Sequence, residues 1–180
     1  RTTVDRYDPT RPPAQRWTLV SIDGRAPTAD EADKAAKAYA TAFVPSYGRL
    51  ARWVGAKAIR SEADGRAVYR YAGLPKGTLD FNGKDLSADT NAEAFVAPGP
   101  APFVERTRFV SNKPFRMMLV ARVERFEASQ RFRAGADGRP VPVEFVTEMV
   151  GSMMGKAGSV RTVTTFSDVR AVGAAGSPSR

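Results

Sequence analysis

Paired carboxylates are the first candidates for acid–base chemistry in this 180-residue sequence, because the chain contains no histidine and no cysteine. The lack of histidine excludes Ser-His-Asp triads and the commonest general base. The lack of cysteine excludes disulfides, thiolate nucleophiles and cysteine-based zinc or iron–sulfur sites. Glu144 and Glu148 share one face of an expected strand, but the intervening residues separate them by about 13 Å, too far for a catalytic pair. We therefore expect no catalytic residue, no metal and no cofactor.

A glycine-flanked segment, Gly151-Ser-Met-Met-Gly155-Lys156, partly matches a phosphate-binding loop. Its glycines are closer together than the loop requires, and Ala157 stands where a Ser or Thr would hold magnesium. We interpret the segment as a hairpin connection in which Met153 and Met154 are adaptable apolar side chains. We expect no nucleotide site here.

The chain is basic, with 28 Lys and Arg residues against 19 Asp and Glu residues and a net charge of +9. Such a charge attracts nucleic acids, anionic lipids or acidic partners. A single-stranded nucleic acid also needs aromatic rings among the basic side chains. Here Phe115, Phe126 and Phe132 alternate with arginines, which puts rings and guanidinium groups on opposite strand faces. We expect no nucleic-acid binding and an outward face that carries Arg106, Arg108, Arg116, Arg122, Arg125, Arg131 and Arg133.

The first part of the chain predicts a strand and then helices. Trp17–Ile22 is rich in apolar and β-branched residues and is expected to form the strand. Thr28 and Glu31 form the pattern of a capping box, so a helix is expected to begin at Thr28 and to end at Pro45. Ser46 is expected to cap a second short helix. The residues expected on the inner side of that helix are Tyr47, Leu50, Ala51 and Val54.

From residue 56 onward the apolar period changes to two, which indicates antiparallel strands. The pairs Asp64-Gly65, Asn82-Gly83 and Asp137-Gly138 predict tight turns. Residues 83–103 are expected to form a loop. The clearest strands are expected at 115–123, 124–134, 141–149 (with Val143, Phe145 and Met149 on one face) and 160–172.

These elements predict an α+β fold, a curved antiparallel sheet or incomplete β-barrel with the short helices of residues 28–54 packed on its concave face. We expect one domain over residues 1–172 and a flexible Gly/Ser/Pro-rich tail over 173–180. The concave face is expected to be apolar and to bind a ligand if the barrel leaves a cavity, whereas an ordinary closed core is the alternative. The residues expected to line the cavity are Phe43, Leu50, Trp53, Phe115, Met117, Leu119, Phe132, Phe145 and Met149.

Two segments resemble known proteins. Arg16-Trp-Thr-Leu-Val-Ser-Ile-Asp-Gly-Arg-Ala-Pro-Thr28 resembles an opening found in uncharacterised envelope proteins of Proteobacteria. Val163-Thr-Thr-Phe-Ser-Asp-Val-Arg170, after Asp137-Gly-Arg-Pro-Val, is similar to their last strands. Those proteins look like relatives of the LolA/LolB-type lipoprotein carriers, although here a strand precedes the helix. The resemblance implies a LolA-like half-barrel lidded by helices, an apolar ligand, no catalysis, and a periplasmic or outer-membrane location after removal of a signal peptide.

Two functional hypotheses follow from the sequence. In the first, the protein is a non-enzymatic carrier or binding protein for the acyl chains of lipids or lipoproteins, with an anionic membrane surface or another envelope protein as a further partner. In the second, the interior is packed, and the protein is a structural or interaction module that uses its Arg-rich surface. The two differ in whether the interior holds a continuous cavity of some hundreds of Å³.

Overall fold

The computed structural model describes residues 1–39, 46–53, 56–81, 84–117 and 121–170. The chain divides into two compact units, Arg1–Val44 with Arg170–Arg180, and Pro45–Val169. The expectation of a single domain over residues 1–172 stays a prediction. The tail expected over residues 173–180 lies outside the described residues.

The first unit pairs two strands and adds one helix. β1 (Thr3–Tyr7) runs antiparallel to β2 (Trp17–Ile22), which confirms the predicted strand, and η1 (Pro13–Gln15) lies between them in the chain. α1 (Ala29–Tyr39) contacts β2, and the rings of Trp17 and Tyr39 stack with centroids 5.7 Å apart. Among the described helices, none combines the length and the apolar character of a membrane span.

A capping box opens α1, as the sequence predicts. The Thr28 backbone N–H donates to the Glu31 carboxylate at 2.8 Å, and the Glu31 backbone N–H donates to the Thr28 hydroxyl at 3.3 Å. Arg25 donates two further hydrogen bonds to the same carboxylate, at 2.9 and 2.6 Å. The Arg25 guanidinium and the Thr28 N–H hold the pKa of Glu31 well below its usual range. These contacts fix where the helix begins.

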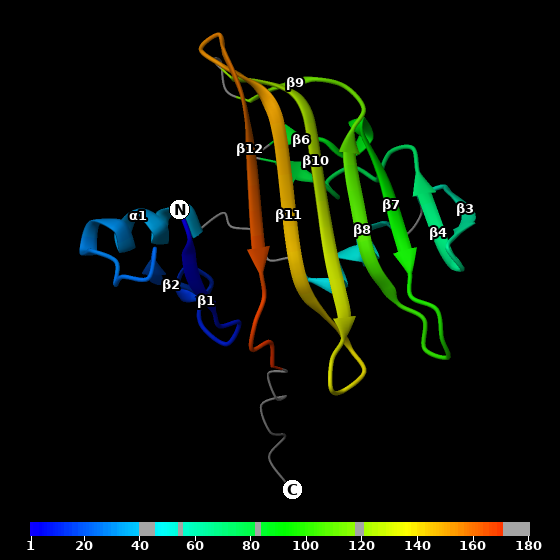
Figure 1. Cartoon of the computed structure of the whole chain (residues 1–180), viewed down its shortest axis with the longest axis horizontal. Coiled ribbons are helices and arrows are strands. Elements are labelled where there is room, and N and C mark those ends of the chain that lie inside the picture. Colours follow the sequence, from blue (N-terminus) through cyan, green and yellow to red (C-terminus); the bar gives the residue numbers. More distant parts are fainter. Residues whose placement is uncertain (40–45, 54–55, 82–83, 118–120, 171–180) are drawn as a thin grey trace, which may run out of the picture. The chain divides into compact units, whose positions relative to one another are not determined.

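The second unit contains an antiparallel sheet that is open. Seven strands follow the order β12-β11-β10-β8-β7-β4-β3, drawn from left to right in Figure 1, and β9 pairs with β10. The edge strands β12 and β3 do not pair with each other in this order, so the antiparallel sheet of the predicted fold is confirmed in an unclosed form. The strands are β3 (Ala58–Ala63), β4 (Arg66–Tyr71), β7 (Thr90–Val96), β8 (Val104–Ser111), β9 (Phe115–Met117), β10 (Ala121–Ala134), β11 (Pro140–Met153) and β12 (Lys156–Thr165). The remaining elements of the unit are η2 (Tyr47–Trp53), η3 (Ser87–Asp89) and the small pair of β5 (Asp80–Phe81) and β6 (Lys84–Asp85).

Tight turns lie where the sequence predicts them. Asp64-Gly65 joins β3 to β4 with φ values of 52° and 70°, and Gly138 has a φ of 76° in the β10–β11 connection. Met154-Gly155 joins β11 to β12 with φ values of 50° and 79°, so the segment interpreted as a hairpin connection is one. Positive φ at both central residues gives the turn the twist that the flanking strands need. Asn82-Gly83 lies outside the described residues.

Several expected strand boundaries are wrong. Residues 83–103, expected to form a loop, contain β7 in the interior of the sheet. Alanine contributes little β-propensity, so the alternation in β7 is a weak signal. The strand expected over 115–123 is two antiparallel strands, β9 and β10, in which Phe115 lies opposite Val123. The strand expected over 160–172 ends at Thr165.

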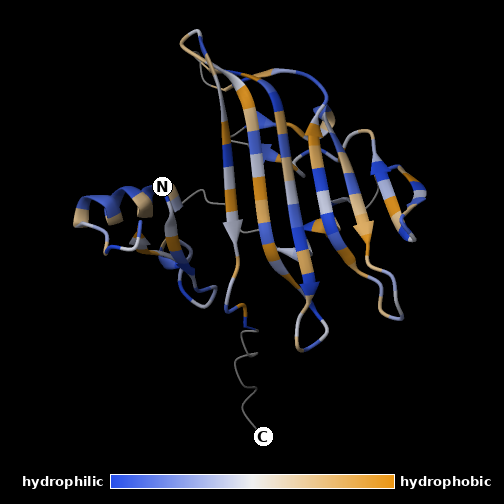
Figure 2. Ribbon diagram, viewed as in Figure 1, coloured by the Kyte–Doolittle hydropathy of each residue, from blue (hydrophilic) through white to orange (hydrophobic). Residues whose placement is uncertain are grey.

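The main sheet has two chemically different faces. Phe109, Phe126 and Phe145 lie on the face that we name the apolar face, and Arg108 and Glu127 lie on the opposite one, the charged face. Figure 2 shows the alternation as hydrophobic and hydrophilic bands along β10 and β11. Side chains alternate in this way because successive Cβ atoms of a strand point to opposite faces.

Two bulges in the β10–β11 pair change the phase of this alternation. One lies between Val123 and Arg125, so that Val123 and Phe126 share the apolar face although they are three residues apart. The other lies where Phe132 pairs with Pro142 and Arg131 pairs with Glu144, which leaves Val143 as the extra residue. Val143 is therefore not part of the continuous alternation that the sequence predicts for it.

Trp53 packs η2 against the apolar face. Ala92 on β7 lies between Tyr71 on β4 and Phe109 on β8, and its short side chain leaves space for the indole. The Tyr71 and Phe109 rings meet the indole edge to face, with centroids 5.0 and 5.4 Å away. This arrangement is the preferred geometry of aromatic pairs.

The second short helix is present but is a 3₁₀-helix, which changes the residues on its inner side. A 3₁₀-helix has three residues per turn, so Tyr47, Leu50 and Trp53 align along it. Tyr47 meets the Phe132 ring edge to face at 5.3 Å, and Leu50 packs against the core cluster. Ala51, which an α-helical period puts on this side, is exposed instead.

A buried hydroxyl on the apolar face leads to a first prediction. Thr107 is fully buried on β8, and its Oγ1 has no hydrogen-bond partner among the described residues. Thr107→Val is expected to raise the free energy of unfolding by about 1 kcal/mol, since it removes an unsatisfied polar group. Thr90 is equally buried, but its hydroxyl donates to the Leu86 carbonyl at 2.8 Å. Thr90→Val is therefore expected to lose about 1 kcal/mol in the same urea titration. Equal losses in the two variants would contradict the prediction.

Candidate functional site

The apolar face gathers the described residues that were predicted to line a binding site. Trp53 and Phe115 are buried in its core cluster, and Phe132 is buried beside Tyr47. The partly buried members that pack against the cluster are Leu50, Met117, Phe145 and Met149. Phe43 and Leu119 lie outside the described residues. The predicted residues thus form a packed cluster, and the cavity between them stays a prediction.

Burial on the apolar face falls steadily from β10 to the edge strand. Phe126 on β10, Met149 on β11 and Val160 on β12 are directly opposite one another in register. Within this row, Phe126 is 2% exposed, Met149 is partly buried and Val160 is 57% exposed. Every residue of β12 is exposed. The apolar surface of the second unit therefore extends beyond its own core.

Positive side chains lie beside the apolar cluster. Arg49 and Arg52 flank Leu50 on η2, and Arg52 donates to the Gly77 carbonyl at 3.3 Å. Burial and the neighbouring Arg52 charge lower the pKa of Arg49. The Lys84 ammonium lies 5.5 Å from the centroid of the Phe115 ring. This positive charge beside apolar surface suits an amphiphile with an anionic head.

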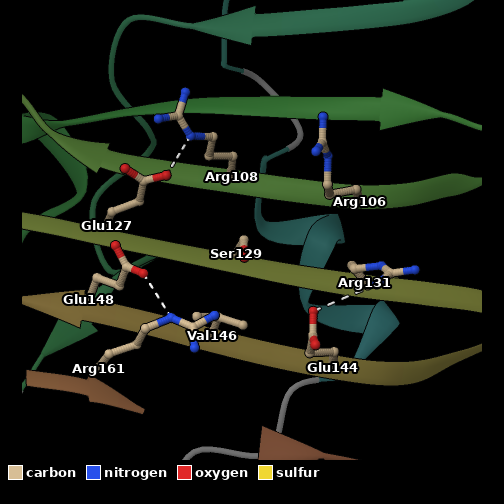
Figure 3. Close-up of a pocket in the computed structure, with 9 residues that line it drawn as sticks. All are labelled: Arg106, Arg108, Glu127, Ser129, Arg131, Glu144, Val146, Glu148 and Arg161. Atoms are coloured by element: carbon tan, nitrogen blue, oxygen red, sulfur yellow. Dashed lines mark hydrogen bonds and ion pairs between the residues drawn. The ribbon is translucent and has the colours of Figure 1, made fainter. Parts of the chain in front are cut away.

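The charged face contains a hollow of about 330 Å³ (Figure 3). Ser129 on β10 and Val146 on β11 lie opposite each other at its floor. Their side chains are shorter than those around them, so the sheet surface is lower there. The rim consists of Arg106, Arg108, Arg131, Arg161, Glu127, Glu144 and Glu148.

Ion pairs compensate the charges at one end of the hollow. Glu127 accepts from Arg108 at 2.7 Å and from Arg125 at 2.7 Å, and Glu148 accepts from Arg161 at 2.9 Å. The hydrogen bonds from Arg108 and then from Arg125 lower the pKa of Glu127 against the effect of burial. This end is therefore a set of matched surface ion pairs, each of which contributes little to stability.

The other end of the hollow is less well compensated. Arg131 and Glu144 approach each other only to 3.8 Å. The Arg106 guanidinium lies 3.8 Å from the centroid of the Phe95 ring, which is a cation–π contact. The alternation along each strand predicts that these arginines lie on an outward face, but it does not predict the hollow or the carboxylates on its rim. Alternation within a strand identifies a face, whereas the neighbours across the sheet depend on register.

Val160, which extends the apolar face, is not among the residues predicted to line the site. The alternation of Val160, Thr162 and Thr164 along β12 was an available signal. It is weak because the threonines are polar and Gly158 lies within the strand, shortly after Gly155 of the turn.

Comparison of the chain with protein-family models, curated protein sequences and solved structures found no match. The resemblance to the LolA/LolB-type carriers therefore stays a prediction, as do the ligand and the envelope location that it implies. The described residues offer two surfaces for binding. One is the margin of the apolar face, where Met149 and Val160 extend from the core toward the edge strand, and the other is the hollow on the charged face.

Proposed function

We propose that the protein is a non-enzymatic binding protein that holds the acyl chain of a lipid or lipoprotein on the apolar face of its open sheet. The row of Phe126, Met149 and Val160 carries this proposal, because it extends apolar surface from the core to an exposed edge strand. Exposed apolar surface that continues from a core is a common mark of a ligand or partner site. We further propose that the protein carries this lipid or lipoprotein within the bacterial envelope.

The chemistry of the margin favours a flexible chain as the occupant. Met149 and Met117 are partly buried, and methionine side chains adapt to irregular ligands. Each buried methylene contributes about 0.8 kcal/mol, so a fatty acyl chain supplies useful affinity before the costs of ordering. Arg49 and Arg52 on η2 supply the positive charge that an anionic head requires.

A second prediction tests the proposal through Phe145, which is partly buried on the apolar face of β11. The delipidated chain is titrated with dansyl-labelled undecanoic acid, and binding is followed by dansyl fluorescence. Phe145→Arg is expected to weaken binding about tenfold or more, because it puts a charge where the chain lies. Circular dichroism confirms that the variant is folded.

Val150→Arg is the matched control. Val150 lies on the same strand, on the charged face, and is 48% exposed, so this variant is expected to bind the probe like the wild type. Equal affinity of the folded Phe145→Arg and Val150→Arg variants would contradict the assignment of the apolar face. A wild-type chain with no saturable signal would contradict acyl binding itself and favour the packed interaction module.

A further inference from the structure

Two arginines face each other across neighbouring strands of the charged face. Arg106 on β8 lies directly opposite Arg131 on β10. Like charges at opposed positions of an antiparallel pair repel each other and destabilise the sheet. Glu144 lies 3.8 Å from Arg131, and Arg106 has no ion pair with a carboxylate of the described residues. Positive charge therefore remains in excess at this end of the hollow.

The contacts of Arg106 hold its guanidinium in place without neutralising it. The guanidinium lies over the Phe95 ring at 3.8 Å from the centroid. Stacking of this kind fixes the plane of the guanidinium and leaves its N–H groups at the edge free to donate. Figure 3 shows Arg106 and Arg131 at the same end of the hollow, on neighbouring strands. Oriented guanidinium donors are well suited to hydrogen-bond the oxygens of a phosphate or a carboxylate.

Ser129 adds a third donor beside this pair. It lies two residues from Arg131 on the same face of β10 and opposite Arg108 in register. Its hydroxyl forms no hydrogen bond among the described residues, and it lines the floor of the hollow. At the other end, Arg108 and Arg161 already have carboxylate partners at 2.7 and 2.9 Å. An anion is therefore expected at the Arg106–Arg131 end.

We propose that Arg106, Arg131 and Ser129 form a binding site for a phosphate monoester. Such a group carries a charge of about −1.5 to −2 at pH 7 and can accept hydrogen bonds from both guanidinium groups, although Glu144, 3.8 Å from Arg131, offsets part of their positive charge. The hollow of about 330 Å³ has room for the organic part of a small ester. The phosphate belongs either to a free small molecule or to a lipid headgroup, and both present the same chemistry. The site lies on the face opposite the apolar one, so it does not rest on the proposed function.

A third prediction tests this site with inorganic phosphate and glycerol 3-phosphate as probes. Calorimetric titration of the full chain is compared with that of the double variant Arg106→Gln/Arg131→Gln, which is expected to bind glycerol 3-phosphate about tenfold more weakly. Thermal unfolding of the wild type and of the double variant is also measured in sodium chloride without phosphate, as the reference. Sodium phosphate at equal ionic strength is expected to stabilise the wild type and not the variant.

Arg116→Gln/Arg122→Gln is the matched control, because these arginines also lie directly opposite each other, on β9 and β10. It removes the same charge outside the hollow and is expected to bind like the wild type. Equal weakening by both double variants would overturn the proposal, since it would indicate a general charge effect. Phe145→Arg, on the other face, is expected to leave phosphate binding unchanged.

Vesicles separate the two sources of the phosphate. Phosphatidylcholine vesicles with and without phosphatidic acid are floated with the wild type and both double variants. Binding of soluble glycerol 3-phosphate that depends on Arg106 and Arg131 supports a free ligand. Flotation with phosphatidic acid alone, lost in Arg106→Gln/Arg131→Gln, supports a headgroup. If neither probe binds, or if binding survives in that variant, the proposal is overturned.

Discussion

The Gly151→Ala variant is expected to lose about 3 kcal/mol of its free energy of unfolding. Gly151 on β11 lies opposite Val123, beside the bulge that precedes Arg125. A Cβ atom at this position falls well inside contact distance of the Arg122 carbonyl oxygen and 3.0 Å from the Val123 Cα. Both contacts are with backbone, so no side-chain rotation relieves them. The pairing of β10 with β11 has to shift instead.

Gly158→Ala provides the control, because Gly158 is the partner of Gly151 on β12. A Cβ atom at Gly158 meets no heavy atom within 4 Å beyond its chain neighbours. This variant is expected to keep its stability or to gain about 0.5 kcal/mol, since Ala is favoured over Gly inside a strand. Urea unfolding followed by circular dichroism measures both variants. A Gly151→Ala variant as stable as Gly158→Ala would show that the strands tolerate a side chain at the bulge.

The bulge beside Gly151 also explains why a local reading of the sequence fails in β10. Val123 and Phe126 are three residues apart, so strict alternation puts them on opposite faces, yet both lie in the core. The bulge adds one residue to the strand and restores the phase. No residue type in this segment indicates the bulge, because the position of a bulge depends on how the partner strand is paired.

Features decided by near neighbours in the chain were predictable. The capping box of Thr28 and Glu31 and the turn of Asp64-Gly65 depend on contacts within a few residues. By contrast, β7 was missed because Ala92 and Ala94 are small for a strand. The short side chain of Ala92 is explained by the Trp53 indole beside it, and Trp53 is distant in sequence.

In the candidate sites too, features that depend on near neighbours in the chain were predictable, and features that depend on distant residues were not. The apolar residues of the predicted site, such as Phe145 and Met149, were identified because alternation assigns a face. The opposition of Arg106 and Arg131 is a matter of register between two strands that are far apart in the chain. A shift of one residue in that pairing would remove the opposition without changing the pattern within either strand. The basic face is therefore predictable from the sequence, whereas the opposed pair of arginines is not.

Trp53→Ala is expected to cost about 3–5 kcal/mol of the free energy of unfolding, which is the usual range for removing a buried aromatic side chain. The indole is 7% exposed and contacts the rings of both Tyr71 and Phe109. Its removal leaves a space above the short side chain of Ala92. Trp53→Phe is expected to lose less, because a smaller ring retains part of the edge-to-face contact.

Loss of the Trp53 indole is also expected to affect ligand binding, because η2 contains residues of the proposed acyl-binding site. Leu50 and Arg49 lie on η2, and Trp53 is the most buried residue of that element. Loss of the indole contact is therefore expected to weaken dansyl-undecanoic acid binding as well as stability, whereas Trp17→Ala in the first unit serves as a control for removing an indole. Thermal unfolding and dansyl titration are measured on the same samples. If Trp53→Ala stays as stable as the wild type and binds the probe equally well, the indole is not what positions η2 for acyl binding.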